Sequence, residues 1–120
     1  RVTNTHLVPT MIHALLEQPN IGEFDLSDLR FMYYAASSMP TETLKRATAT
    51  FACDFAQGYG STEGGMVTRL TPEDHRRARG GRDDLLLSCG RPLANVGVRI
   101  APPGNSEDDT VGEIMVRSPM

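Results

Sequence analysis

The chain has 120 residues, of which 39% are hydrophobic and 22% charged, and its formal net charge at pH 7 is −3. These values are ordinary for a globular protein and allow one domain with a modest core. A weakly acidic chain does not predict a nucleic-acid surface, because such surfaces depend on clustered Lys and Arg against phosphates. The sequence contains no apolar run long enough to cross a bilayer.

The two ends of the sequence favour a piece excised from a longer protein. The chain begins with Arg1 rather than Met and enters a helical pattern almost at once, and it ends at Met120 directly after a strand-like run. No signal-peptide pattern opens it. The cysteines, Cys53 and Cys89, lie far apart and outside any CxxC pair. We therefore expect reduced thiols, a cytoplasmic location and no cysteine metal site.

Helical and strand-like patterns alternate at the start of the chain. A short helix is expected over residues 9–17, and a loop with partly buried apolar residues over 21–28. The apolar face of this helix would be formed by Met11, Ile12, Leu15 and Leu16. The aromatic run at 31–35 predicts a buried strand.

A second helix is expected to begin near Pro40, because proline suits a first helical turn in which its missing N–H has no partner. Its apolar stripe would consist of Leu44, Ala47 and Phe51. Residues 51–55 predict a second strand, which a glycine-rich turn over 57–65 follows. Residues 66–70 predict a third strand.

The second half of the chain is dominated by strand patterns. Thr71 is the expected N-cap of one further short helix, which the glycine pair at 80–81 ends. Alternating apolar residues over 96–101 and 111–117 predict two half-buried strands, and 102–110 a hairpin-like loop between them. The sequence therefore predicts an α/β fold, a partial open sheet with flanking helices and a β-rich C-terminal part.

The segment at 57–63, Gln-Gly-Tyr-Gly-Ser-Thr-Glu, carries residue types that a magnesium–nucleotide complex needs. It follows a predicted strand, and ligands in open α/β sheets bind beyond the carboxyl ends of strands. Its glycines allow a ligand to approach the backbone closely. Tyr59 offers a flat ring for a base, Thr62 a hydroxyl for a phosphate oxygen, and Glu63 a hard carboxylate for Mg²⁺. The same residues also fit a tight turn with a capping threonine, so the motif alone leaves both interpretations open.

This segment resembles the Tyr-Gly-x-Thr-Glu signature of the adenylate-forming superfamily, which includes acyl-CoA synthetases, firefly luciferase and the adenylation domains of peptide synthetases. Four other segments resemble family landmarks: Val-Pro-Thr at 8–10, Ala-Ala-Ser-Ser-Met-Pro at 35–40, Gly-Arg-Pro-Leu at 90–93 and Gly-Glu-Ile at 112–114. The family usually has Gly-Gly-Ala-Pro-Leu-Pro at the second of these. Because the five landmarks occur in the family's order and spacing, the chain as a whole resembles this family.

The resemblance implies an adenine slot between the ring of Tyr59 and the small-residue segment. The nucleotide-binding residues that it implies are Ala35, Ala36, Ser37, Gln57, Gly58, Tyr59, Gly60 and Thr62. Thr62 would contact the α-phosphate and Glu63 would bind Mg²⁺, so these two are the implied catalytic residues. Met39 and Ser61 would lie near an acyl pocket, although a methionine there equally suits an ordinary core position.

The reaction that the resemblance implies has two half-reactions. A carboxylic acid attacks the α-phosphorus of ATP to give acyl-AMP and pyrophosphate, and the thiol of CoA then displaces AMP. ATP or AMP, Mg²⁺ and CoA are thus the implied cofactors and co-substrates. The segments at 70–75 and 90–92 look like those of bacterial fatty-acyl-CoA ligases, which favours a fatty acid as the substrate.

The family's phosphate loop and its C-terminal catalytic lysine have no counterpart in the sequence. The resemblance therefore makes residues 1–120 a central fragment of the AMP-binding N-terminal domain, inactive alone. Two alternatives stay open. A peptide-synthetase adenylation domain would carry an acidic residue facing the substrate amine, in a position upstream of this chain. A non-catalytic nucleotide-binding or interaction module would lack the phosphate loop and the lysine in the longer protein as well.

The remaining polar residues do not predict a second site. His6, His13 and His75 do not cluster and are expected at the surface or in loops, His75 exposed after the helix cap. Asp54 is expected to be a satisfied polar residue at a strand end. Ser61 lacks the GxSxG context of a nucleophilic serine.

Overall fold

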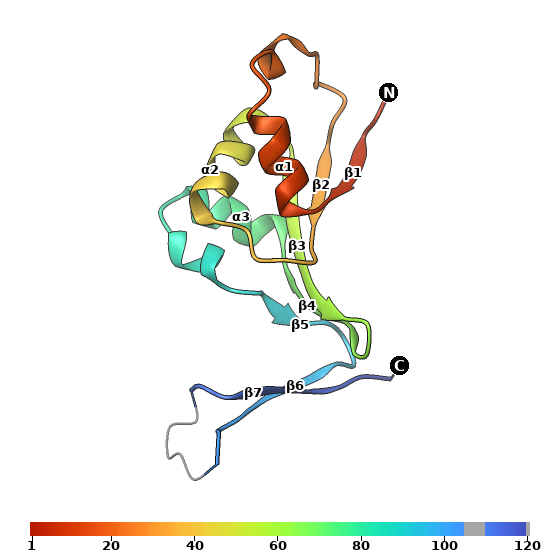
Figure 1. Ribbon diagram of the computed structural model, residues 1–120, viewed down its shortest axis with the longest axis vertical. Helices are drawn as coiled ribbons and strands as arrows, with labels where there is room; N and C mark the ends of the chain where they lie inside the picture. Colours follow the sequence, from red (N-terminus) through yellow and green to blue (C-terminus); the bar gives the residue numbers. More distant parts are fainter. Residues whose placement is uncertain (105–109, 120) are drawn as a thin grey trace.

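The computed structural model describes residues 1–104 and 110–119, and within these ranges five strands form one mixed sheet (Figure 1). The sheet consists of β1 (Asn4–Leu7), β2 (Phe31–Tyr34), β3 (Asp54–Ser61), β4 (Gly65–Leu70) and β5 (Arg91–Pro92), in this order. Strands β1, β2 and β3 run parallel, whereas β4 is antiparallel to β3 and β5 to β4. The predicted α/β class with an open sheet is confirmed.

Three helices lie together on one side of the sheet (Figure 1). They are α1 (Pro9–Leu16), α2 (Thr41–Thr50) and α3 (Pro72–Arg79), and two short 3₁₀ helices, η1 (Ile21–Glu23) and η2 (Asp83–Leu87), lie in the connections. The predicted face of the first helix is half wrong. Ile12 and Leu16 are buried, whereas Met11 and Leu15 are exposed, because only one narrow stripe of this two-turn helix packs on the core.

The hydrophobic core lies between the helices and the sheet. It consists of Ile12, Leu16, Met32, Tyr34, Leu44, Ala47, Phe51, Cys53 and Phe55. The predicted stripe of the second helix is therefore confirmed, since its three residues are all in this set. Burial of apolar side chains is the main favourable term in folding, so the core also fixes where the ends of β2 and β3 lie.

The structure corrects the prediction for β3. Phe51 is the C-cap of α2 and Ala52 has a φ of 45°, so the strand begins only at Asp54. It then continues to Ser61, through half of the segment predicted as a glycine-rich turn, and the turn itself is limited to residues 62–64. The pairing with β4 shifts register between Tyr59 and Gly60. This register shift lets the strand continue through Gly58 and Gly60, although glycines in such a short segment predict a turn.

The last two strands form a separate antiparallel hairpin of β6 (Gly97–Ala101) and β7 (Glu113–Arg117), which lies apart from the helices (Figure 1). The radius of gyration of 16.4 Å exceeds the roughly 14 Å expected for a compact chain of this length. The strands are present as predicted, but β7 is exposed along its whole length rather than half-buried. Exposed apolar residues of this region are Ile100, Val111, Ile114, Met115 and Val116. Part of the predicted loop, 105–109, lies outside the described residues.

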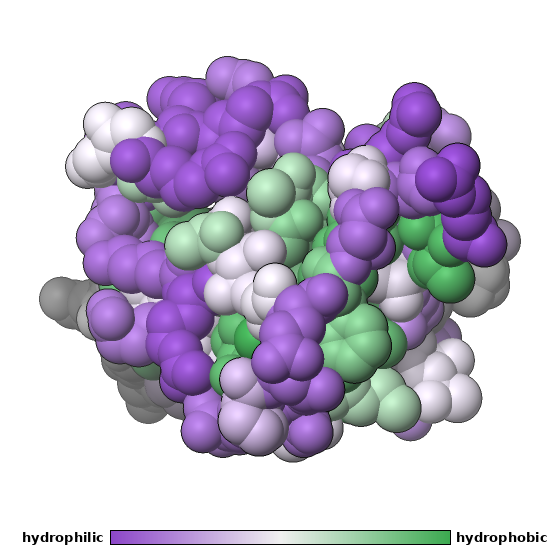
Figure 2. Space-filling model, turned by 90° about the horizontal axis from the view of Figure 1, so that it is seen from above, coloured by the Kyte–Doolittle hydropathy of each residue, from purple (hydrophilic) through white to green (hydrophobic). Residues whose placement is uncertain are grey.

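Apolar surface also occurs at the end of the molecule that carries η1 and the N-terminus. Figure 2 shows this end, with apolar patches lying between polar side chains. A pocket of about 490 Å³ opens there between β1, α1 and the segment 21–29. Within the described part of the chain, no helix is both long and apolar enough to span a membrane.

Helix α3 begins with a capping box. The Thr71 hydroxyl accepts a hydrogen bond from the Asp74 backbone N–H at 3.2 Å, and the Asp74 carboxylate accepts one from the Thr71 backbone N–H at 3.0 Å. The Thr71 hydroxyl also donates to this carboxylate at 2.6 Å. That hydroxyl is the main cause that lowers the pKa of Asp74 to about 2. The predicted cap is confirmed.

The Ala36 backbone is strained in the connection between β2 and α2. Its φ of 78° lies in the left-handed region, where an L-residue other than glycine costs about 1–2 kcal/mol. The resemblance places a family glycine at this position, which is the residue that accepts this conformation without cost. Alanine in place of the family's glycine at this position therefore adds strain to the backbone.

We expect Thr71→Ala to lower the free energy of unfolding by about 1 kcal/mol, because it removes the cap of α3. Urea unfolding at neutral pH measures this change, with Thr10→Ala, at an exposed position of α1, as the control. Ionised Asp74 stabilises the fold above the ordinary aspartate pKa, and this contribution is lost as the pH falls from about 4 to about 2. Thr71→Ala should reduce that acid dependence. Equal losses in both variants would contradict the capping box.

We expect Ala36→Gly to leave stability unchanged or raise it by up to about 1 kcal/mol, since relief of strain offsets the added entropy of the unfolded chain. Ala49→Gly in α2 is the matched control, because glycine in a helix of ordinary geometry costs about 1 kcal/mol. Thermal unfolding of the two variants compares them. A loss at Ala36 as large as that at Ala49 would show that the left-handed conformation is wrong.

Candidate functional site

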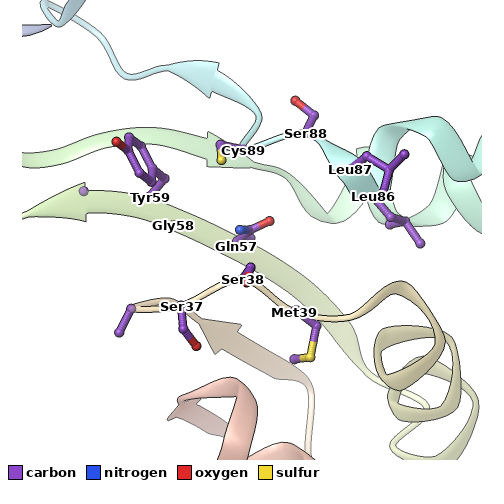
Figure 3. A pocket seen from close by; sticks show the side chains of 12 residues that line it. Ser37, Ser38, Met39, Gln57, Gly58, Tyr59, Leu86, Leu87, Ser88 and Cys89 are labelled. Atoms are coloured by element: carbon purple, nitrogen blue, oxygen red, sulfur yellow. The ribbon is translucent and has the colours of Figure 1, made fainter. Parts of the chain in front are cut away.

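A pocket of about 400 Å³ opens at the carboxyl ends of β2 and β3 (Figure 3). Three segments form it, namely the connection after β2, the second half of β3, and the end of η2 with the two residues that follow it. Its lining residues are Ala36, Ser37, Ser38, Met39, Gln57, Gly58, Tyr59, Gly60, Leu86, Leu87, Ser88 and Cys89. Adjacent carboxyl ends of parallel strands are the usual position of ligand sites in open α/β sheets.

The structure brings most of the predicted site residues together in this pocket. Those that line it are Ala36, Ser37, Met39, Gln57, Gly58, Tyr59 and Gly60. Ala35 is half-buried directly after β2 and is not part of the lining. Ser61, Thr62 and Glu63 continue the chain beyond Gly60 and are exposed at the tip of the β3–β4 hairpin, outside the lining.

Strand β3 forms the floor of the pocket. Gln57 and Tyr59 are two residues apart, so their side chains point to the same face of the sheet. Tyr59 is half-buried and pairs with Thr68 of β4. Gly60 allows β3 and β4 to approach each other closely, because a Cβ atom built there would lie 2.1 Å from the carbonyl oxygen of Gly65. Any side chain at this position would therefore separate the two strands.

The connection after β2 forms one wall. Ser37 and Ser38 are exposed, and Met39 is half-buried and packs against the hydrophobic core. Figure 3 shows these three residues on one side of the pocket and residues 86–89 on the other. Small side chains at 36–38 leave room for a flat group between this wall and the opposite one.

The opposite wall, residues 86–89, was not predicted from the sequence. It lies over the sheet because the chain turns tightly at Gly90, whose φ is 85° and whose added Cβ would lie 2.0 Å from the carbonyl oxygen of Arg69. The Thr68 hydroxyl donates a hydrogen bond of 2.6 Å to the carbonyl oxygen of Cys89, which fastens the wall to β4. The landmark at 90–93 directly follows this wall and is the signal that points to it.

Glu63 is the residue suited to a hard cation. Its own backbone N–H and the Ser61 hydroxyl lower the pKa of its carboxyl group, so it is ionised at neutral pH. Among the described residues, no group of three or more His, Cys, Asp or Glu could hold a metal ion. A magnesium ion would therefore be bound by this one carboxylate together with phosphate oxygens and water, which is how Mg²⁺ commonly binds beside a nucleotide.

The prediction of an exposed His75 is wrong. Its side chain lies in the core with 2% of the residue exposed, next to the Tyr34 hydroxyl and the Thr71 carbonyl oxygen. Burial is possible because these two groups satisfy both ring nitrogens. His6 and His13 are exposed, as predicted.

Asp54 and the cysteines agree with the predictions from sequence. Asp54 is the first residue of β3 and accepts a hydrogen bond of 2.6 Å from the Arg76 guanidinium group. Cys53 is buried and Cys89 exposed, and both are free thiols.

Comparisons with known proteins show the family of the chain. The sequence matches the family described as AMP-binding enzyme over residues 1–120. It is 39% identical over 123 residues to the medium/long-chain-fatty-acid–CoA ligase FadD8 of Mycobacterium tuberculosis, which covers 100% of the chain and 20% of that protein. The chain thus spans about a fifth of the length of the curated relatives that it matches.

Solved structures give the same result. The amide bond synthetase McbA from Marinactinospora thermotolerans matches with a TM-score of 0.81 and 35% identity, over 100% of the chain and 24% of that protein. The O-succinylbenzoate coenzyme A synthetase MenE from Bacillus subtilis, in complex with ATP and a magnesium ion, matches with a TM-score of 0.72 and 28% identity, over 98% of the chain and 23% of that protein. From its sequence and its fold, the chain belongs to the family of AMP-binding, adenylate-forming enzymes.

Proposed function

We propose that residues 1–120 form the adenine end of the nucleotide site in an acyl-CoA synthetase that activates a fatty acid. The observation that carries this proposal is the pocket at the carboxyl ends of β2 and β3, which joins the small-residue segment to Tyr59. The likeness to a fatty-acid–CoA ligase supports the class of substrate and the use of CoA.

The floor and walls suit a flat aromatic base. The Tyr59 ring provides a surface for stacking, and the small side chains of Ser37 and Ser38 leave the facing wall open. The side chains of Gln57, Ser37, Ser38 and Ser88 are polar groups of the lining that are available to orient the base. The volume of about 400 Å³ is within the range of small-molecule sites.

The phosphate groups would extend from the pocket toward the tip of the β3–β4 hairpin. Thr62 and Glu63 lie there, two and three residues after the floor residue Gly60. The Thr62 hydroxyl would donate to an α-phosphate oxygen, and the ionised Glu63 carboxylate would hold Mg²⁺. That ion would supply positive charge beside the phosphates while the carboxylate of the fatty-acid substrate attacks the α-phosphorus. Both residues are exposed at this tip, so they can meet phosphates that lie outside the pocket.

We place the chain in the central part of the large N-terminal domain of a longer, cytoplasmic enzyme. The chain spans about a fifth of its curated relatives, and its β6–β7 hairpin exposes a series of large apolar residues. A two-stranded hairpin is marginally stable alone, which supports further protein packing on it. The phosphate loop and catalytic lysine of the family would be supplied by this longer protein, so the isolated chain should be inactive.

The likeness to an amide bond synthetase supports a second candidate, in which an amine rather than the thiol of CoA accepts the acyl group. Both candidates share the adenylation step and the pocket. Supplying the longer protein with ATP, a fatty acid and either CoA or an amine separates them, because the product is a thioester in one case and an amide in the other.

We expect AMP to bind the chain and to shift the NMR amide signals of residues 36–38 and 57–60. Tyr59→Ala should weaken binding by about tenfold or more, since base stacking on an aromatic ring contributes roughly 1–3 kcal/mol. Tyr59→Phe, which keeps the ring, should bind nearly as well as the wild type. Equal weakening by both substitutions would show that the ring does not stack on the base.

In the longer protein, we expect Glu63→Gln to slow formation of acyl-AMP and to raise the Mg²⁺ concentration needed for half-maximal rate, because the neutral amide is a poorer ligand for Mg²⁺. ATP–pyrophosphate exchange at several Mg²⁺ concentrations measures this, with the exposed Glu23→Gln as control. An unchanged Mg²⁺ dependence would remove Glu63 from the site. Exchange catalysed by the 120-residue chain alone would contradict its proposed role as a fragment.

A further inference from the structure

A chain of hydrogen bonds runs behind the pocket and connects its two walls. It begins at Tyr34, the last residue of β2, which is fully buried and lies two residues before Ala36 of the first wall. The Tyr34 hydroxyl lies 3.0 Å from the Nε2 atom of His75 on α3. This contact ties the end of the strand that leads into the first wall to α3, the helix that packs against η2 and precedes the second wall.

The contacts of His75 fix its tautomer. Its Nδ1 atom lies 2.8 Å from the Thr71 carbonyl oxygen, which can only accept a hydrogen bond. Nδ1 therefore carries the proton in the neutral ring, and Nε2 presents its lone pair. The Tyr34 hydroxyl must then donate to Nε2, so that every polar atom in this part of the core has a partner.

The chain of contacts continues from Thr71 to the second wall. Thr71 and Asp74 hold each other through the capping box of α3. The Asp74 carboxylate, which is buried, accepts hydrogen bonds of 3.2 and 3.3 Å from the Arg91 guanidinium group. Arg91 directly follows Gly90, where the second wall turns onto β4. The contacts thus span from the start of one wall to the end of the other.

We propose that the Tyr34–His75 hydrogen bond, continued through Thr71 and Asp74 to Arg91, is a positioning device that keeps the two pocket walls at the spacing needed to bind adenine, and that protonation of His75 weakens it. The inference rests on the proposed function, because the occupant of the pocket is taken to be an adenine nucleotide. None of the five residues lines the pocket, so their effect on binding is indirect.

Protonation weakens the arrangement because it gives Nε2 a hydrogen and reverses the bond. Nε2 then donates to the Tyr34 hydroxyl oxygen, and the Tyr34 hydroxyl must turn its own hydrogen away from Nε2 into the apolar core. Burial lowers the pKa of His75, so the neutral ring prevails at neutral pH. Burial also raises the pKa of Tyr34, which keeps that hydroxyl protonated throughout.

Charged groups from several elements face His75. On α3, Asp74 favours its protonation, and Arg79 opposes it. Lys45 of α2 and Asp83 of η2 line a second pocket, of about 340 Å³, together with His75, but they pair with each other at 2.6 Å. The net direction is set by burial. Affinity should be constant above the ordinary histidine pKa of about 6.5 and fall as the pH drops through the lowered pKa of the folded state.

The first test needs no nucleotide. In the isotope-labelled chain, the ring nitrogens of His75 should show a neutral ring with its proton on Nδ1 at neutral pH. As the pH is lowered from about 8 to about 5, the amide signals of residues 35–38 and 89–91 should shift with the same midpoint as His75. In His75→Gln this shared transition should vanish, whereas in His13→Gln, at an exposed position, it should persist. Walls that do not titrate with His75 would overturn the proposal.

The second test measures the affinity for AMP over the same pH range. We expect the wild type to bind at least about fivefold more weakly at the acidic end, and Tyr34→Phe to bind weakly at every pH with no such dependence. Ile12→Val, a core change in α1 outside the lining of the pocket and outside the chain of hydrogen bonds, controls for lost stability. If it weakens AMP binding and alters the pH profile as Tyr34→Phe does, the role is merely structural and positioning is refuted. If the wall signals titrate with His75 but the chain does not bind AMP, the coupling between His75 and the walls is retained. AMP is then rejected as the occupant of the pocket.

Discussion

The site depends on two places where backbone approaches backbone so closely that a side chain cannot fit. At Gly60 the end of β3 lies close against Gly65 of β4, which lets the two strands of the hairpin pair beneath the pocket. At Gly90 the chain turns against Arg69 and carries residues 86–89 back over the sheet. A methyl group at either position would overlap a carbonyl oxygen and push the floor or a wall out of place. The pocket is therefore shaped first by steric limits on the backbone, and only then by the side chains that line it.

The pocket and the hydrophobic core share the same elements. Tyr34 and Phe55 lie in the core on neighbouring parallel strands, and the lining of the pocket begins two residues after each of them, at Ala36 and Gln57. Packing of α2 and α3 against these strands thus holds the pocket as well as the fold. The polar contacts of His75 lie within this packed region, which explains how a histidine can be buried without an unpaired nitrogen. Thr62 and Glu63, in contrast, lie outside the packed region and are exposed at the tip of the β3–β4 hairpin.

Much of this could be predicted from the sequence, because some signals are local. The stripe of α2 and the Thr71 cap depend on residues a few positions apart, and both predictions are confirmed. The landmark at 57–63 indicated the family, and the match of the family to residues 1–120 confirms it. These signals also selected most residues of the pocket before its geometry was known.

The remaining errors concern contacts between distant segments. Local reading of 57–61 predicts a turn, but pairing with β2 and β4 makes it a strand. His75 looks like a surface residue beside charged neighbours, and only its meeting with Tyr34, distant in sequence, explains its burial. Likewise, nothing within 86–89 indicates that it covers a pocket, since that depends on how Gly90 meets β4. Sheet register and helix packing decide these features, and neither is encoded by a short window of sequence.

The proposed function requires adenine to lie between the Tyr59 ring and the small-residue wall at 36–38. Intermolecular nuclear Overhauser effects between AMP and the labelled chain measure whether it does. We expect contacts from the adenine ring protons to the Tyr59 ring and to the Ala36 methyl group in the same complex. Contacts to another surface, such as the apolar pocket beside β1, with none to Tyr59, would contradict it.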